Sequence, residues 1–87
     1  MNLTSFQRNN IVRLRCLGYK LVKYMHLKND VRVDLVKPTP KGYALAMIKR
    51  GVIYYRHYDH QIPSNIKDVW QLIDEIGEEQ ALTVMSI

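Results

Sequence analysis

The chain has 87 residues, of which 47% are hydrophobic and 24% are charged, and it contains one cysteine, Cys16. This length allows a single domain over residues 1–87 with a modest core, and one cysteine excludes an intramolecular disulfide. No apolar run approaches the roughly 20 residues that span a bilayer, and the first residues do not resemble a signal peptide. We therefore expect a cytoplasmic protein that does not act in a membrane, in the host cytoplasm if a phage or plasmid encodes it.

The formal net charge of +5 is unevenly distributed. Residues 1–58 contain 12 Lys and Arg against two acids, a balance of +10, whereas residues 59–87 contain one Lys against six acids, a balance of −5. A basic body followed by an acidic last third favours attraction to a polyanion or to an acidic protein surface. The alternative is an ordinary solvated surface, part of which is covered by an acidic helix.

A helix is predicted over residues 5–17. Thr4 and Gln7 have the spacing of a capping box, in which each side chain bonds the backbone N–H of the other residue. Gly18 suits the left-handed residue that ends many helices. Apolar residues recur at helical spacing within this segment, namely Phe6, Ile11, Leu14 and Leu17.

Two alternating segments follow, over residues 19–28 and 31–35, and predict strands. Lys23 interrupts the alternation of the first segment. The dipeptide Asn29-Asp30 between the segments is typical of a turn, because both residue types tolerate positive φ.

The next signals are a loop and a hairpin. Residues 38–42, with two prolines and a glycine, predict a loop. Residues 43–48 and 52–58 flank Lys49-Arg50-Gly51, which predicts a tight hairpin. Because the four strand segments are joined by short connections, an antiparallel meander is the expected topology.

The last helix is predicted to begin at Pro63-Ser64, with Ser64 as N-cap. Its apolar stripe consists of Ile66, Val69, Trp70, Ile73 and Ile76. Either Gly77 ends this helix or residues 78–82 continue it, and residues 83–87 are apolar enough to add a short strand.

The expected fold class is therefore α+β, a single small domain with the order α-β-β-β-β-α, an antiparallel meander sheet and two helices on one face. The expected core comprises Phe6, Leu14, Val33, Leu35, Ile53, Trp70 and Ile73. A winged helix is the alternative, with residues 20–28 as its second helix, a recognition helix from residue 31 and a wing at 49–51. The β-branched, alternating residues 31–35 favour the strand.

No motif indicates a cofactor, and no metal site is expected. His57, Asp59 and His60 are potential metal ligands, but their spacing matches no known metal motif. A non-catalytic protein is favoured over an enzyme. If the chain is instead a small toxin-type ribonuclease, we expect His26 or His57 to be the acid–base group.

The element order is similar to that of double-stranded-RNA-binding domains and of small toxin ribonucleases with that shape. Those toxins carry Gly-Ser-His on the first strands, where this chain has Tyr24-Met25-His26 without the Gly-Ser pair. The lysine-rich start of the last helix typical of double-stranded-RNA binders is reduced to Lys67. The resemblance therefore implies membership of neither family.

The strongest functional signal is the interleaving of basic residues with tyrosines on the strands. Tyrosine rings stack on unpaired bases, and Arg and Lys neutralise phosphates. The candidate binding residues, expected on one sheet face and at a hairpin tip, are Lys20, Tyr24, Arg32, Lys49, Arg50, Arg56 and Tyr58. Tyrosine is also simply a good strand residue, which is the competing structural explanation.

The favoured hypothesis is a binding module for nucleic acid, or for a nucleic-acid-handling protein, acting as a monomer or homodimer. A second hypothesis is a phage- or plasmid-encoded inhibitor of a host defence nuclease, similar in role to an anti-CRISPR protein, which acts by protein–protein binding. The third is the small ribonuclease.

Overall fold

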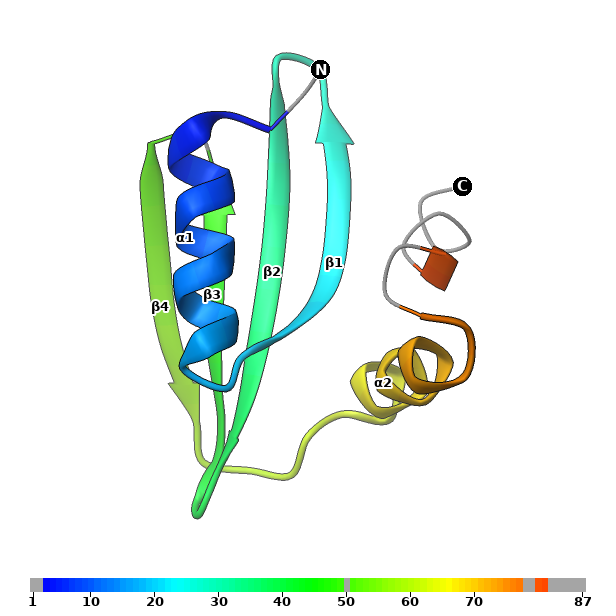
Figure 1. The fold of residues 1–87 in the computed structure, drawn as a ribbon. Helices are drawn as coiled ribbons and strands as arrows, with labels where there is room; N and C mark the ends of the chain where they lie inside the picture. The colour runs from blue at the N-terminus through cyan, green and yellow to red at the C-terminus, as the bar shows by residue number, and fades with distance from the viewer. Residues whose placement is uncertain (1–2, 50, 78–79, 82–87) are drawn as a thin grey trace.

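A computed structural model of the protein describes residues 3–49, 51–77 and 80–81. A helix, four strands and a second helix follow one another along the chain (Figure 1). They are α1 (Ser5–Cys16), β1 (Lys20–Leu27), β2 (Asp30–Thr39), β3 (Gly42–Lys49), β4 (Val52–Tyr58) and α2 (Ser64–Ile76). The strands form one antiparallel sheet in the order β1-β2-β3-β4. The predicted α+β class, element order and meander are confirmed.

The winged-helix alternative is wrong. Residues 20–27, which it requires as a helix, form β1, and residues 31–34 lie within β2. Residues 32–34 pair with β1 on one side and with β3 on the other, so they occupy the interior of the sheet. Their β-branched and alternating character suits this position.

The predicted capping box starts α1. The Gln7 backbone N–H donates to Thr4 Oγ1 at 3.1 Å, and the Thr4 backbone N–H donates to Gln7 Oε1 at 3.0 Å. These bonds satisfy two donors that the first turn of a helix otherwise leaves unpaired. The helix ends at Cys16, and Gly18 adopts a φ of 97° that a side chain would disfavour.

The inward side of α1 differs from the predicted one. Phe6, expected in the core, is 39% exposed, whereas Gln7 is buried beside it. Gln7 Nε2 donates to the Val31 carbonyl oxygen at 2.7 Å. Because Gln7, Ile11 and Leu14 have i, i+4, i+7 spacing, they share the side of the helix that faces the sheet. The sequence-based prediction placed Phe6 in the core because of its hydrophobicity. The buried Val31 carbonyl oxygen, however, requires a polar partner, which Gln7 supplies.

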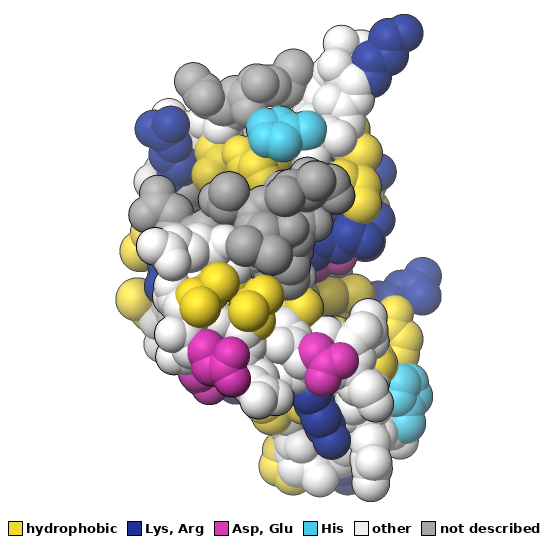
Figure 2. All heavy atoms as spheres, turned by 90° about the vertical axis from the view of Figure 1, so that its right-hand side faces the viewer, with side chains coloured by type: hydrophobic (Ala, Val, Ile, Leu, Met, Phe, Trp, Pro, Cys, Tyr) yellow, Lys and Arg dark blue, Asp and Glu magenta, His cyan; other side chains and the backbone are white. Residues whose placement is uncertain are grey.

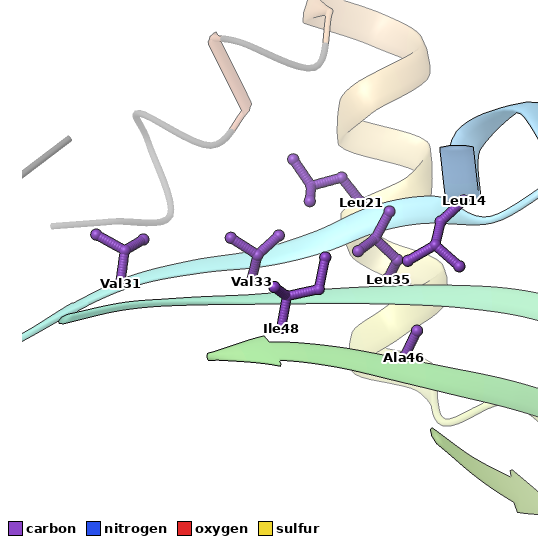
Figure 3. Packing of buried hydrophobic residues seen from close by; sticks show 7 residues of the cluster. All are labelled: Leu14, Leu21, Val31, Val33, Leu35, Ala46 and Ile48. Atoms are coloured by element: carbon purple, nitrogen blue, oxygen red, sulfur yellow. The ribbon is translucent and has the colours of Figure 1, made fainter. Parts of the chain in front are cut away.

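The core lies between α1 and the sheet. Its buried cluster consists of Leu14, Leu21, Val31, Val33, Leu35, Ala46 and Ile48 (Figure 3). Figure 3 shows the strand members pointing to the same side of the sheet. Leu14, Val33 and Leu35 confirm the predicted core, and Ile53 packs against it while partly buried.

The strand β2 is longer than predicted. It continues through Pro38 to Thr39, which were expected in a loop, and β3 begins at Gly42. Pairing with β1 ends at Val36, so the last residues of β2 have β3 on one side and, among the residues that the structure describes, no paired strand on the other. A proline, which lacks the backbone N–H, is tolerated at such an edge position.

The two helices occupy different places. α1 covers the core face. α2 contacts the edge strand β1 and lies beside it, and Figure 1 views α2 almost along its axis. Trp70 and Ile73 of α2 are consequently half-buried and lie outside the cluster beneath α1. We expected both helices on one face of the sheet, and α1 lies there. α2 lies instead at the β1 edge of the sheet.

Neither described helix is long and apolar enough to span a membrane. Two parts of the sequence-based prediction, Arg50 and the short strand at residues 83–87, lie outside the described residues.

Candidate functional site

The sheet face opposite the core carries cations on every strand. Because side chains alternate between faces, the paired registers place five basic residues on this side: Lys20, Lys23, Arg32, Lys49 and Arg56. We call this surface the basic face. The predicted residues Lys20, Arg32, Lys49, Arg56 and Tyr58 lie on it.

Tyr24, which was predicted on the same face, lies on the opposite one. It pairs with Val33 and packs against the core cluster. The cause is a register shift between Leu21 and Lys23, where Val22 has no partner on β2. Such a bulge adds one residue to one strand and inverts the alternation beyond it. A count by two from Lys20 therefore gives the wrong face for Tyr24.

The same bulge brings Lys23 onto the basic face, where sequence reasoning did not place it. Lys23 pairs with Asp34 across β1 and β2. The signal was present in the sequence, because Lys23 interrupts the alternation of its segment. An interruption of this kind is what a bulge produces.

Asp34 is the acid in the middle of the basic face, and Arg32 neutralises it. Arg32 Nε donates to Asp34 Oδ1 at 3.0 Å, and Nη2 donates to Oδ2 at 2.9 Å, which is a bidentate ion pair. The hydrogen bond to Asp34, opposed by burial and aided by the carboxylate charge, raises the pKa of Arg32. Lys49 lies directly across from Arg32 on β3.

The exposure of the basic face increases from β2 to β4. Val36 and Tyr43 are buried on it, whereas Val52 is 48% exposed and Tyr54 is 52% exposed. On β4, Tyr54 lies between Val52 and Arg56, and all three side chains are on the basic face. Sequence reasoning missed Tyr54, although its parity with Arg56 and Tyr58 indicated a shared face.

Tyr58 is part of an aromatic stack at the far end of β4. Its ring is stacked on Tyr43 with a centroid distance of 4.9 Å, and His60 lies against both rings at 5.4 and 5.5 Å. Because Tyr43 is almost fully buried, this stack is a structural anchor for the end of the sheet. Tyr54 is accordingly the better placed ring for a ligand.

The β1 side of the basic face is bounded by α2. Lys20 Nζ lies 5.2 Å from the centre of the Trp70 ring, a cation–π contact between the two elements. Figure 2 looks at this side of the molecule and shows the visible Asp and Glu side chains grouped in its lower half, at the level of α2 in Figure 1. The described acids of α2 are Asp68, Asp74 and Glu75.

A second polar group occupies the core side of the sheet at the ends of β2 and β4. His57 Nε2 lies 2.8 Å from Thr39 Oγ1, and His57 Nδ1 lies 3.0 Å from Asp59 Oδ1. A carboxylate only accepts, so a neutral His57 donates from Nδ1 and accepts the Thr39 hydroxyl proton at Nε2. This hydroxyl–imidazole–carboxylate chain is open to water, with the Asp59 side chain 79% exposed.

The chain of contacts crosses over β3. Thr39 pairs with Gly42, and His57 pairs with Ala44, so the two small residues lie between the bonded side chains. Strands two apart are separated by about 10 Å, which these side chains span together. A larger residue in place of Ala44, which lies directly across from His57, would stand between them.

His26 has a different environment. Its ring packs edge-on against Tyr24 at a centroid distance of 5.1 Å. Of the two histidines considered for acid–base chemistry, His57 is therefore the one with an oriented hydroxyl and carboxylate. Within residues 3–49, 51–77 and 80–81, no three His, Cys, Asp or Glu side chains are placed to hold a metal ion.

Comparison of the chain with protein-family models, with curated proteins and with solved structures found no match.

Proposed function

We propose that the protein binds single-stranded nucleic acid through the basic face of its sheet. The observation that carries this proposal is the combination, on one sheet face, of the cations of β1, β3 and β4, with Arg32 of β2 paired to Asp34, and the exposed ring of Tyr54. Lysine and arginine neutralise phosphates and release condensed counterions. Aromatic rings stack on unpaired bases, which are available in single strands and not in a duplex.

Charge supports the same surface. The carboxylate of Asp34 is already paired with Arg32, so it adds little repulsion toward a phosphate. Lys49 and Arg56 lie on neighbouring strands beside Tyr54, in the most exposed half of the face. Lys49 and Arg56 would thus bind a phosphate while a neighbouring base stacks on the Tyr54 ring.

The acidic residues of α2 favour a particular position for the ligand. They lie beside β1, where they repel a polyanion. We therefore place the bound strand over β3 and β4, away from α2. Cytoplasmic nucleic acid is the source that fits a chain with one cysteine.

The test is fluorescence anisotropy with labelled single-stranded and duplex RNA and DNA at two salt concentrations. Wild type is expected to prefer single strands and to lose affinity as salt rises. Lys49→Glu/Arg56→Glu should weaken binding by at least about tenfold and flatten the salt dependence, because each lost phosphate contact lowers the slope by about 1. Tyr54→Ala should weaken binding by about 1–3 kcal/mol with the salt dependence unchanged.

The matched control is Arg8→Glu/Lys67→Glu, which makes the same change in charge on α1 and α2. Arg8 and Lys67 are exposed and lie outside the basic face. If this control weakens binding as much as Lys49→Glu/Arg56→Glu, the affinity comes from net charge and the proposed site is wrong. Absence of binding to every nucleic acid at low salt contradicts the proposal, and a protein partner, such as a nuclease that this chain inhibits, becomes the function to test by pull-down.

A second candidate function, ribonuclease activity, is supported by the contacts of His57. Asp59 orients its ring, and Nε2 faces a hydroxyl, the position that an RNA 2′-hydroxyl would occupy during proton transfer. His57→Ala should abolish cleavage of a labelled RNA with the circular dichroism spectrum unchanged, whereas His26→Ala should retain it. Equal rates for wild type and His57→Ala would contradict this candidate.

A further inference from the structure

The two edges of the sheet differ in how well they are protected. β1 carries Lys20 and Lys23, has the unpaired Val22 and has α2 beside it. Lysines, bulges and covering helices are the usual means by which proteins prevent an edge strand from pairing with another chain.

β4 has none of these protections among the described residues. It pairs with β3 in one continuous register from Val52 to Tyr58, and its sequence contains no lysine, proline or glycine. Its outer side has no strand partner within the described part of the chain, and Figure 1 shows it as the outermost strand of the sheet. Val52, Tyr54 and Tyr55 are about half exposed, at 48%, 52% and 55%. β-branched and aromatic residues are those that strand pairing favours.

We propose that β4 pairs with β4 of a second copy of this chain, antiparallel and about a twofold axis at Tyr55. Tyr55 is the central residue of the seven in β4, so this register pairs the whole strand. The same surface is then used on both copies, as a twofold interface requires. The two sheets join into one, and the unpaired backbone groups of both edges become bonded.

The side chains of β4 are complementary in this register. Tyr54 lies opposite Arg56 of the second copy on the basic face, which places a guanidinium beside an aromatic ring. On the core face, Ile53 lies opposite His57 and Tyr55 opposite Tyr55. A parallel arrangement would instead place the two Arg56 side chains next to each other, and like charges on neighbouring strands destabilise a sheet.

The helices leave room for this pairing. Leu14 packs in the cluster formed mainly by β2 and β3, so α1 lies at least one strand inside β4. Two α1 helices related by the axis would be about 14 Å apart or more, because strands are about 4.8 Å apart. Packed helices approach to about 8–10 Å, so no overlap results. Arg13 reaches β4 with its long side chain, donating to the Tyr55 hydroxyl at 2.8 Å.

The test is sedimentation velocity of the full chain without nucleic acid, from about 1 μM to about 1 mM. Wild type is expected to shift from the monomer mass to twice that mass within this range. Tyr55→Lys, which places a lysine at the centre of the edge, should remain a monomer throughout. Leu27→Lys is the matched control, because it adds a lysine at the exposed end of β1 and should dimerise as wild type does.

Cysteine cross-linking tests the register. In a Cys16→Ser background, which removes the exposed native thiol, Tyr55→Cys should form a disulfide-linked dimer on oxidation because it lies opposite itself. Ile53→Cys should not, because it faces His57 of the second copy. A wild type that stays monomeric, or a dimer that persists in Tyr55→Lys, would falsify the proposal. Either result leaves the nucleic-acid proposal intact, because that is measured by binding alone.

Discussion

Gln7 connects the start of α1 to the sheet with one side-chain amide. Its oxygen accepts from the Thr4 backbone N–H, and its nitrogen donates to the buried Val31 carbonyl oxygen. Gln7→Ala removes the bond from the Thr4 backbone N–H and leaves the buried Val31 carbonyl without its side-chain partner, whereas the bond from the backbone N–H of residue 7 to Thr4 Oγ1 remains. We expect a loss of about 2–4 kcal/mol in the free energy of unfolding, measured by urea denaturation.

Thr4→Ala tests the other half of the capping box. It removes the bond to the Gln7 backbone N–H and leaves the contact with Val31 in place. The expected loss is about 1 kcal/mol. A Thr4→Ala loss as large as that of Gln7→Ala would contradict the larger contribution expected from the two bonds of the Gln7 side chain.

Gly42 is required by a close approach of β4 to β3. A Cβ atom at this position would overlap the backbone carbonyl oxygen of Tyr58, whereas one at Gly51 would have no heavy atom within 4 Å. Gly42→Ala should therefore lower the free energy of unfolding by about 1–3 kcal/mol or more, because backbone cannot move aside as a side chain can. Gly51→Ala should change it by less than about 0.5 kcal/mol, and thermal denaturation of both variants decides the point.

The bulge in β1 explains how this edge strand accommodates an extra residue. Val22 has no partner on β2, so its deletion leaves Leu21 paired with Leu35 and Lys23 paired with Asp34. Every other β1 side chain keeps its face. We expect the variant lacking Val22 to fold with a loss of less than about 2 kcal/mol, measured by urea denaturation.

Deletion of Met25 is the comparison, because it shortens β1 by the same amount. Lys23 then takes the place that Tyr24 holds against the core, and Tyr24 moves to the basic face. Placing an amine against apolar side chains adds a loss of about 1–3 kcal/mol. Equal stability of the two deletion variants would show that the bulge does not set the faces of β1.

The elements that the sequence predicted best are those with local signals. The capping box at Thr4 and the turn at Asn29 depend on residues near one another in the chain, and the structure has them. The inward position of Gln7 depends on a carbonyl that lies 24 residues away, and no local pattern reveals it. The face of Tyr24 depends on where β2 loses register, which alternation alone cannot locate.

At the scale of the whole molecule, stability is expected to decrease from the centre of the sheet toward α2. β2 and β3 are paired on both sides and contain most of the buried cluster, whereas α2 has no buried residue among those described. Amide hydrogen exchange should therefore be slowest in β2 and β3 and faster in α2 than in α1, where Gln7 and Leu14 are buried. Exchange in α2 as slow as in β3 would contradict this order.

The sequence predicted the type of candidate site, a basic sheet face, better than it predicted which residues lie on that face. The charge excess of residues 1–58 and the strand pattern indicated a basic sheet face, and five of the seven residues proposed for binding lie on it. Tyr24 lies elsewhere because of Val22, and Arg50 is outside the described residues. Lys23 and Tyr54 join the site because register and exposure, rather than residue type, decide which side chains meet a ligand.

The contact between Thr39 and His57 has an evolutionary consequence. It passes over β3 beside the small residue Ala44, so Thr39, Ala44 and His57 form a set whose members constrain one another. Gly42 is fixed separately, because a Cβ atom there would overlap the Tyr58 backbone, whereas the contact between Thr39 and His57 constrains Ala44. In descendants of this sequence, a larger residue at position 44 should therefore occur together with replacement of Thr39 or His57, and that covariation would record the contact without a structure.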